Sequence, residues 1–181
     1  PYKDHQSLLE ALKVIKNRGQ VFRCLLVGDD ITKQNNELMI LLEKNGIKDW
    51  VLLMGPRNDI NNVMNALDML ILPSISESFG NVLAEAMACG IPCISTDIGM
   101  PGKIVGDTGW VVPPKNPNAL AKTIIEVIDI MQDSISWRLR KKSCRNRIIN
   151  NYSDDIMALK YYNNWQNFLI QENKVFVFCR F

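Results

Sequence analysis

Short apolar runs alternate with amphipathic segments along most of the 181-residue chain. The apolar runs are too short for typical helices and predict buried strands at 21–27, 51–54, 69–72, 92–96 and 109–112. Between and after them, apolar residues recur at helical spacing, which predicts helices at 7–19, 37–45, 61–67, 81–88, 117–131, 136–150 and 155–172. Strands that alternate with helices predict an α/β fold, with a Rossmann-like, doubly wound parallel sheet.

The ends of several predicted helices carry recognisable signals. Ser7 with Glu10 three residues later predicts a capping box, and Gly19 is expected to end the first helix. Pro117 fits the first position of a helix. No repeat, low-complexity tract or linker divides the chain, so residues 1–174 are expected to form one domain. The apolar tail 175–181 is open to three interpretations: an extra edge strand, an interface segment, or the result of an unnatural chain end.

The segment from Pro73 to Gly90 carries the candidate chemistry. A predicted strand ends at Pro73 and a predicted helix begins after Gly80, and open α/β sheets bind ligands at this edge. Free N–H groups at a helix start attract phosphate, while the carboxylates of Glu77 and Glu85 can accept hydrogen bonds from hydroxyls. This combination predicts a ligand that carries both phosphate and sugar. A glutamate near a helix start is also common without any function, because the helix dipole favours it.

Composition and charge narrow the classes of partner. The net charge of +2 and a single histidine argue against a nucleic-acid surface and a histidine-rich metal site. Five cysteines without a C-x-x-C pair predict reduced thiols and no zinc site. No signal peptide and no apolar run of about 20 residues is present, which predicts a cytoplasmic protein, peripheral on a membrane at most.

Six basic residues lie between Arg138 and Arg147, beside Trp137. They predict either a solvated helix face or a surface that is attracted to anionic lipid. The segment Gly99–Lys103 does not have the spacing of a phosphate-binding loop. No G-x-G-x-x-G opens a helix, which argues against a nicotinamide-dependent dehydrogenase.

The residues of the central loop resemble a known signature. Glu77 and Glu85, with Gly80 between them and the run AMACGIP at 86–92, are similar to the E-x7-E motif of retaining, group 1 nucleotide-sugar glycosyltransferases with the GT-B fold. The similarity extends through most of the chain, to LVGD at 26–29, GPRND at 55–59, PS at 73–74, STDIG at 95–99 and GWVVPP at 109–114.

The resemblance implies the carboxyl-terminal, donor-binding half of such an enzyme. It implies that Glu85 binds ribose hydroxyls, that Glu77 binds hexose hydroxyls, and that Lys3 neutralises the diphosphate leaving group. Lys3 and Glu77 are therefore the catalytic candidates. The sugar and distal phosphate would meet backbone amides from Phe79, Gly80, Asn81, Val82 and Leu83. Gly55 and Arg57 would border the base.

The implied reaction transfers a sugar from a UDP or GDP donor to a glycan or lipid-linked acceptor, with retention of anomeric configuration and without a separate cofactor or metal. Ser78 departs from the motif, because glycine is frequent there. By the resemblance, the first strand of the domain, an arginine that binds the diphosphate and the whole amino-terminal acceptor domain lie upstream of Pro1. Residues 1–181 alone are therefore expected to turn nothing over. A non-catalytic binding module or degenerate remnant, and a related nucleotide-sugar epimerase, are the alternatives.

Overall fold

The computed structural model describes residues 2–170 and places five parallel strands in two sheets. In one sheet, β1 (Cys24–Leu26) pairs with β2 (Val51–Leu53). In the other, β4 (Cys93–Thr96) lies between β3 (Leu70–Leu72) and β5 (Trp110–Val112), in register Leu70 to Cys93 and Ile94 to Trp110. The predicted Rossmann-like parallel α/β fold is confirmed, with its sheet in two parts.

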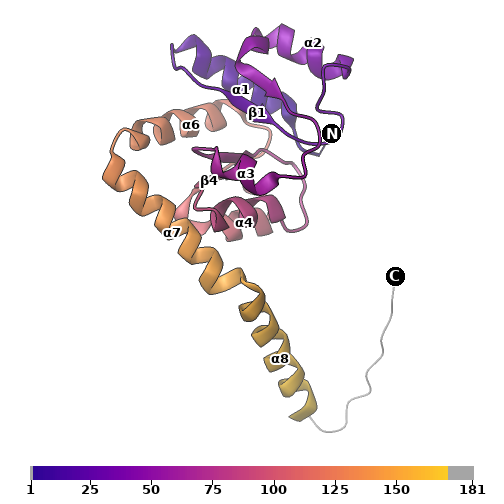
Figure 1. Ribbon diagram of the computed structural model, residues 1–181, viewed down its shortest axis with the longest axis vertical. Coiled ribbons are helices and arrows are strands. Elements are labelled where there is room, and N and C mark those ends of the chain that lie inside the picture. Colours follow the sequence, from indigo (N-terminus) through magenta and orange to yellow (C-terminus); the bar gives the residue numbers. More distant parts are fainter. Residues whose placement is uncertain (1, 171–181) are drawn as a thin grey trace.

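Eight α-helices and two short 3-10 turns connect and cover the described strands (Figure 1). They are α1 (His5–Asn17), α2 (Asn36–Asn45), η1 (Lys48–Trp50), α3 (Ile60–Asn65), α4 (Asn81–Ala88), α5 (Met100–Val105), η2 (Gly106–Thr108), α6 (Pro117–Met131), α7 (Ser134–Tyr152) and α8 (Asp154–Ile170). The bounds of α4 and α6 are those predicted, whereas α5 was not predicted. Figure 1 shows α8 continuing the direction of α7 away from the body of the protein.

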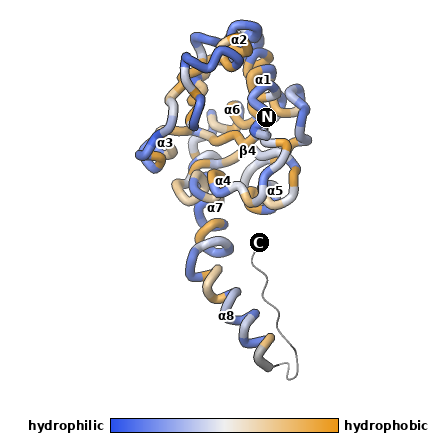
Figure 2. Tube along the Cα trace, turned by 90° about the vertical axis from the view of Figure 1, so that its right-hand side faces the viewer, coloured by the Kyte–Doolittle hydropathy of each residue, from blue (hydrophilic) through white to orange (hydrophobic). Residues whose placement is uncertain are grey.

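Two clusters of buried side chains hold the body together. The first lies mainly among α1, α2 and α6, where Leu8, Leu12 and Ile15 form the buried stripe of α1. The second lies among α4, α5 and α7, with Leu83 and Ile104 fully buried. Hydrophobic residues gather around β4 and α6, whereas hydrophilic and hydrophobic residues are mixed along α8 (Figure 2). The second cluster supports the helix that follows the candidate loop.

The start of α1 differs from the prediction. Its N-cap is Asp4, whose Oδ1 accepts a hydrogen bond from the N–H of Ser7 at 3.2 Å. Ser7 is buried inside the helix, so the predicted capping box at Ser7 is wrong. Asp4 takes a left-handed backbone conformation with φ 45°, which aspartate tolerates better than most residues. Gly19 follows the C-cap Arg18 with a positive φ, so the end of this helix was predicted to within a residue.

The basic stretch of α7 is bonded to the body of the protein. The Arg140 guanidinium donates to the carbonyl of Asp107 and lies 5.0 Å from the centre of the Trp110 ring. Arg145 donates to the carbonyl of Ala88, and Arg147 donates to carbonyls of α5. Arg145 is nevertheless exposed and Arg140 and Arg147 are partly exposed, so the predicted solvated face is also bonded to the body of the protein.

Several predictions concern residues near or beyond the ends of the described range, 2–170. The tail 175–181 and the predicted helix end at 172 lie outside the described residues. Four cysteines are free thiols: Cys24, Cys89, Cys93 and Cys144. The fifth, Cys179, lies outside the described residues. Among the helices of residues 2–170, none combines the length and the apolar character that a membrane crossing requires.

Candidate functional site

The loop between β3 and α4 turns sharply at Gly80. This residue is the N-cap of α4 and has a left-handed backbone, with φ 90° and ψ 49°. A Cβ atom at this position would lie 3.3 Å from Cδ1 of Leu83 and 3.4 Å from Cγ of Pro101. The turn therefore depends on glycine for both conformation and space. It presents the first N–H groups of α4, the groups that favour anions.

Phe79 fixes this turn to the rest of the protein. Its ring meets the Tyr152 ring edge-on, with centroids 6.2 Å apart and planes at 74°. Tyr152 is the last residue of α7, and Phe79 also packs against the second buried cluster. The side chain of Phe79 is thus an anchor, while its backbone remains part of the candidate phosphate-binding turn.

The first residues of the chain lie beside the same loop. The carbonyl of Tyr2 accepts a hydrogen bond from the N–H of Ile75 at 2.9 Å. One residue further along, the Lys3 ammonium forms an ion pair with Oε2 of Glu77. The Glu77 side chain is 20% exposed and the Lys3 side chain 55% exposed. The two predicted catalytic residues are therefore in contact with each other.

Lys3 and Glu85 line one cavity of about 360 Å³, between the start of α1 and the first turns of α4. His5 and Val82 also border it, and its floor is apolar, with Leu8, Leu70 and Leu72 among the lining residues. An apolar hollow with a few polar groups at its rim is the usual form of a small-molecule site. Burial lowers the pKa of His5, which favours a neutral imidazole.

The other predicted residues have different surroundings. Asn81 is exposed, whereas the Leu83 side chain is fully buried and its N–H already donates to the carbonyl of Gly80 at 2.9 Å. Gly55 is buried and exchanges backbone hydrogen bonds with the loop after β1, as acceptor from Gly28 and donor to Ile31. Neither Gly55 nor Arg57 lines the cavity at α4.

Arg57 forms a two-pronged ion pair with Asp59, at 2.8 and 2.7 Å. This contact raises the pKa of Arg57 and lowers that of Asp59, so both groups stay charged. The guanidinium is exposed but already has a carboxylate partner.

Sequence reasoning missed His5 as a lining residue. The signal was present, because His5 is the chain's single histidine and follows Lys3 by two residues. Within residues 2–170, no three Asp, Glu, His or Cys side chains gather as a metal-binding group.

Comparisons with known proteins agree on one family. The profile of the family described as "Glycosyl transferases group 1" matches residues 1–129. The chain is 29% identical over 141 residues to the N-acetyl-alpha-D-glucosaminyl L-malate synthase of Bacillus anthracis, covering 77% of this chain and 36% of that protein. It is 30% identical over 164 residues to the UDP-Gal:alpha-D-GlcNAc-diphosphoundecaprenol alpha-1,3-galactosyltransferase of Escherichia coli, covering 84% and 39%.

A solved structure shows the same fold. The crystal structure of a glycosyltransferase from Rickettsia africae superposes with a TM-score of 0.82 at 28% identity. The superposition covers 95% of this chain and 46% of that protein. The chain thus spans less than half the length of each of these relatives.

Proposed function

Because the chain belongs to the group 1 glycosyl transferases and has the fold of one half of a GT-B enzyme, we propose that it binds the nucleotide-diphosphate sugar of a retaining sugar transfer. One observation carries this proposal. Lys3 and Glu85 line a single cavity beside the glycine turn that opens α4, and Glu77 contacts Lys3 at its edge. One cation, two carboxylates and a free helix start match the charges and hydroxyls of such a donor.

The diphosphate would lie at the start of α4, near Lys3. Breaking the bond to the anomeric carbon builds negative charge on the diphosphate, and fixed positive groups stabilise that charge. The dipole of α4 contributes about 0.3–1 kcal/mol to the binding of an anion at an exposed helix start. The Lys3 ammonium would add a charge-assisted hydrogen bond of roughly 1.5–3 kcal/mol, at the lower end for an exposed group.

The carboxylates would hold the two sugars. Glu85 lies more than one turn into α4, so its carboxylate extends past the phosphate position and would accept hydrogen bonds from ribose hydroxyls. Glu77 precedes the turn and would accept hydrogen bonds from the transferred hexose. Neither is assigned as a nucleophile or as a hydrolase-type acid, because a transferase of this kind activates the donor through its leaving group.

A UDP donor and a glycan or lipid-linked acceptor fit the printed name of the Escherichia coli relative, which names both UDP-Gal and a diphosphoundecaprenol-linked sugar. The acceptor would be held by a second, amino-terminal domain of a longer protein, since the chain spans 39% of that relative. We expect residues 1–181 alone to bind donor weakly and to transfer nothing.

The test compares two variants in the longer protein. Calorimetry with UDP should show weaker binding for Glu85→Ala, by about tenfold for the loss of hydrogen bonds to a charged group. Glu77→Ala should mainly lower turnover of the sugar donor. Glu126→Ala, at an exposed position on α6, is the matched control and should change neither. Unchanged UDP affinity in Glu85→Ala would contradict the site, and unchanged turnover in Glu77→Ala would favour a non-catalytic binding module.

A further inference from the structure

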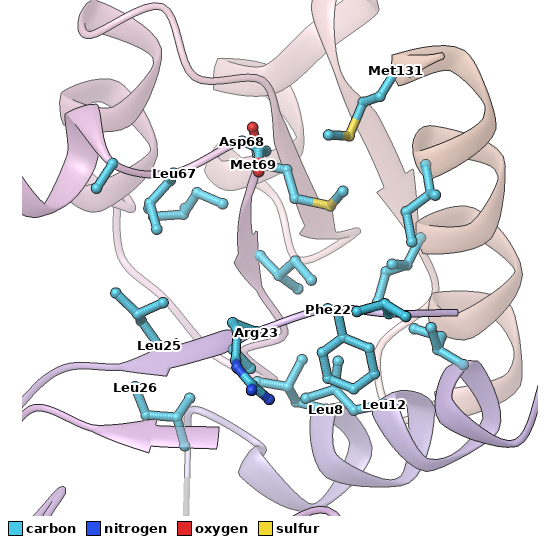
Figure 3. A pocket seen from close by; sticks show the side chains of 18 of the residues that line it. Leu8, Leu12, Phe22, Arg23, Leu25, Leu26, Leu67, Asp68, Met69 and Met131 are labelled. Carbon is cyan, nitrogen blue, oxygen red and sulfur yellow. The ribbon is translucent and has the colours of Figure 1, made fainter. Parts of the chain in front are cut away.

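Most apolar side chains of the body face inward. The gap between β1 and β3 is a cavity of about 690 Å³, and apolar side chains of both strands line it. Figure 3 shows side chains of the surrounding elements converging on this gap, with Leu25 below and Met69 above. α7 is different, because the side of this helix that faces away from the body also carries apolar residues.

The outward side of α7 follows from the period of the helix. Its buried side chains are Trp137, Cys144 and Ile148, and the last two belong to the cluster that supports α4. Figure 1 shows α7 along the outside of the body, so its opposite side faces solvent. That side, the outward face of α7, consists of five exposed residues that recur at intervals of four and three positions: Ile135, Leu139, Lys142, Asn146 and Ile149.

Large apolar side chains are well exposed on the outward face of α7. Ile135 is 62% exposed, Leu139 58% and Ile149 48%. A single exposed apolar residue is ordinary on a protein surface, whereas several that share one side of a helix are typical of a docking surface. The charge around these residues indicates what kind of partner the surface fits.

The charge of α7 has one sign. Residues 134–152 contain six lysine and arginine residues and no aspartate or glutamate. With these six removed from the 21 basic residues of the chain, 15 remain against 19 acidic residues, a net charge of −4. The positive charge of the protein is therefore concentrated in this one helix, and an anionic partner is the complementary one.

The cations on and beside the outward face are not neutralised by acids. Arg138 and Lys142 are exposed, and among residues 2–170 neither side chain has a hydrogen bond or an ion pair. Arg145 is exposed and donates to the carbonyl of Ala88, which leaves its charge without an acid. The acid that precedes the helix, Asp133, already accepts hydrogen bonds from N–H groups of the first turn of α7. These three cations are thus available to an anionic partner.

A second copy of the chain fits this face poorly. Intervals of four and three are also the spacing of a coiled coil. Two α7 helices that packed through their outward faces would, however, bring Arg138, Lys142 and Arg145 of one copy toward the same cations of the other, and like charges repel. A nucleic acid would match the charge but would gain little from the exposed isoleucine and leucine side chains.

We propose that the outward face of α7 docks on an anionic lipid surface. A helix that lies in a membrane interface combines basic residues with apolar side chains that enter the boundary between headgroups and acyl chains. Leu139 and the two isoleucines would enter that boundary. Arg138 and Arg145 lie about one turn on either side of Lys142, so all three would reach the phosphate groups of the lipids. The long stem of Lys142 lets its ammonium remain at the headgroups.

This orientation leaves the candidate donor site accessible. None of the residues 134–152 lines the cavity at Lys3 and Glu85. Cys144 and Ile148 of α7 pack in the same cluster as Leu83 of α4, so the outward face of α7 points away from α4. Docking on lipid requires no donor, and the proposal therefore does not rest on the proposed function.

The test is sedimentation of the full chain with vesicles. One set contains phosphatidylcholine and phosphatidylglycerol in equal parts, and the other contains phosphatidylcholine alone. Two variants are compared with the parent chain, namely the double variant Arg138→Gln with Lys142→Gln, and the single variant Leu139→Ser. The matched control replaces two exposed lysines of other helices, Lys13→Gln with Lys122→Gln. Thermal unfolding followed by circular dichroism checks that each variant is folded.

We expect the parent chain to bind the anionic vesicles and to be released by high salt, which screens the cations. The double variant on α7 should bind about twenty-fivefold more weakly, because each basic residue near an anionic surface contributes about fivefold. Leu139→Ser should weaken binding by about tenfold. The lysine control should change binding by less than twofold.

Three results would overturn the proposal. The first is equal sedimentation with the two kinds of vesicle, or none with either. The second is anionic binding that survives both changes on α7 in folded variants, because another surface would then be responsible. The third is self-association of the chain, measured by analytical ultracentrifugation, that Leu139→Ser abolishes, because the face would then join two copies. Affinity for UDP is not part of these measurements, so the donor site stands or falls separately.

Discussion

Lys3 and Glu77, which are 74 positions apart in the sequence, form an ion pair at the edge of the candidate donor cavity. Glu77 is partly buried, and a carboxylate that is removed from water is costly without a partner. The Lys3 ammonium is that partner. A bound diphosphate would compete for Lys3, and the hexose hydroxyls would then become partners of Glu77. Binding of the donor would thus replace the ion pair between Lys3 and Glu77.

The first prediction concerns the selectivity of Lys3 for phosphate. In the longer protein, Lys3→Met should reduce the preference for UDP over uridine by about tenfold, because one charge-assisted hydrogen bond at an exposed position is lost. Calorimetry with both ligands measures this ratio. Lys122→Met on α6 is the control, since Lys122 is exposed and does not line the cavity. An equal loss of affinity for both ligands would show that Lys3 acts on the fold rather than on phosphate.

The second prediction concerns the turn at Gly80. Gly80→Ala should destabilise the chain by about 2–3 kcal/mol, because alanine pays roughly 1–2 kcal/mol in a left-handed conformation and its Cβ also presses on Leu83 and Pro101. Gly19→Ala is a matched control, since Gly19 has φ 78° but no atom within 4 Å of an added Cβ. Urea unfolding of the two variants gives the difference. Equal losses would mean that space at Gly80 does not matter.

Much of the fold could be predicted because its signals are local. The periodicity of apolar residues placed α4 and α6 at their observed bounds and placed every observed strand within a longer predicted run. α5 could not be predicted in this way, since Met100, Pro101 and Gly102 at its start resemble a loop. Its helical form depends on burial, because Pro101 is fully buried and lies beside Gly80.

The candidate site could be predicted only in part. The spacing of Glu77, Gly80 and Glu85 across one loop and the helix after it is a local signal, and it predicts these residues from the sequence alone. The contact between Lys3 and Glu77 is long-range, and nothing local in either segment encodes it. The same is true of the gap between β1 and β3, because strand order across a sheet is not written in the periodicity of each strand. Arg57 and Asp59 are only two positions apart, so their ion pair is local in the sequence, but it does not indicate that a ligand binds there.

The third prediction concerns Arg147, which links α7 to the end of α5. Its Nε and Nη2 donate to the carbonyls of Ile104 and Lys103, both at 2.7 Å. These carbonyls belong to the last turn of α5, where acceptors have no helical partner. Arg147→Met should destabilise the chain by about 2 kcal/mol, since hydrogen bonds from a charged donor to a helix end are lost.

Urea unfolding at neutral pH measures the loss for Arg147→Met. Arg138→Met serves as the matched control, because Arg138 is an exposed arginine of the same helix. That control should stay within about 0.5 kcal/mol of the parent chain. If Arg147→Lys retained full stability, a single charge would suffice and the two-carbonyl contact would not be the cause.

The last prediction concerns the alkaline stability of the fold and the thiol of Cys24. Burial raises the pKa of Cys24 from 9.0 to about 12. Cys24 keeps part of its surface accessible, and it lines the gap between β1 and β3. The folded protein therefore holds this proton more tightly than the unfolded chain does. The resulting stability is complete below about pH 9 and is lost as pH rises toward 12, because the unfolded chain releases the proton first.

Urea unfolding at a series of pH values from about 8 to 11 would measure this loss, which cannot exceed about 1.4 kcal/mol per pH unit for one proton. Cys24→Ala should lower the stability at neutral pH but flatten its decline above pH 9. Lysine and tyrosine ionisation is common to both proteins, so it cancels in the difference. Cys144, whose pKa burial raises to about 11, remains in both and cancels too. Parallel curves for the two proteins would show that Cys24 releases its proton equally easily in both states, and that the interior around β1 is open to water.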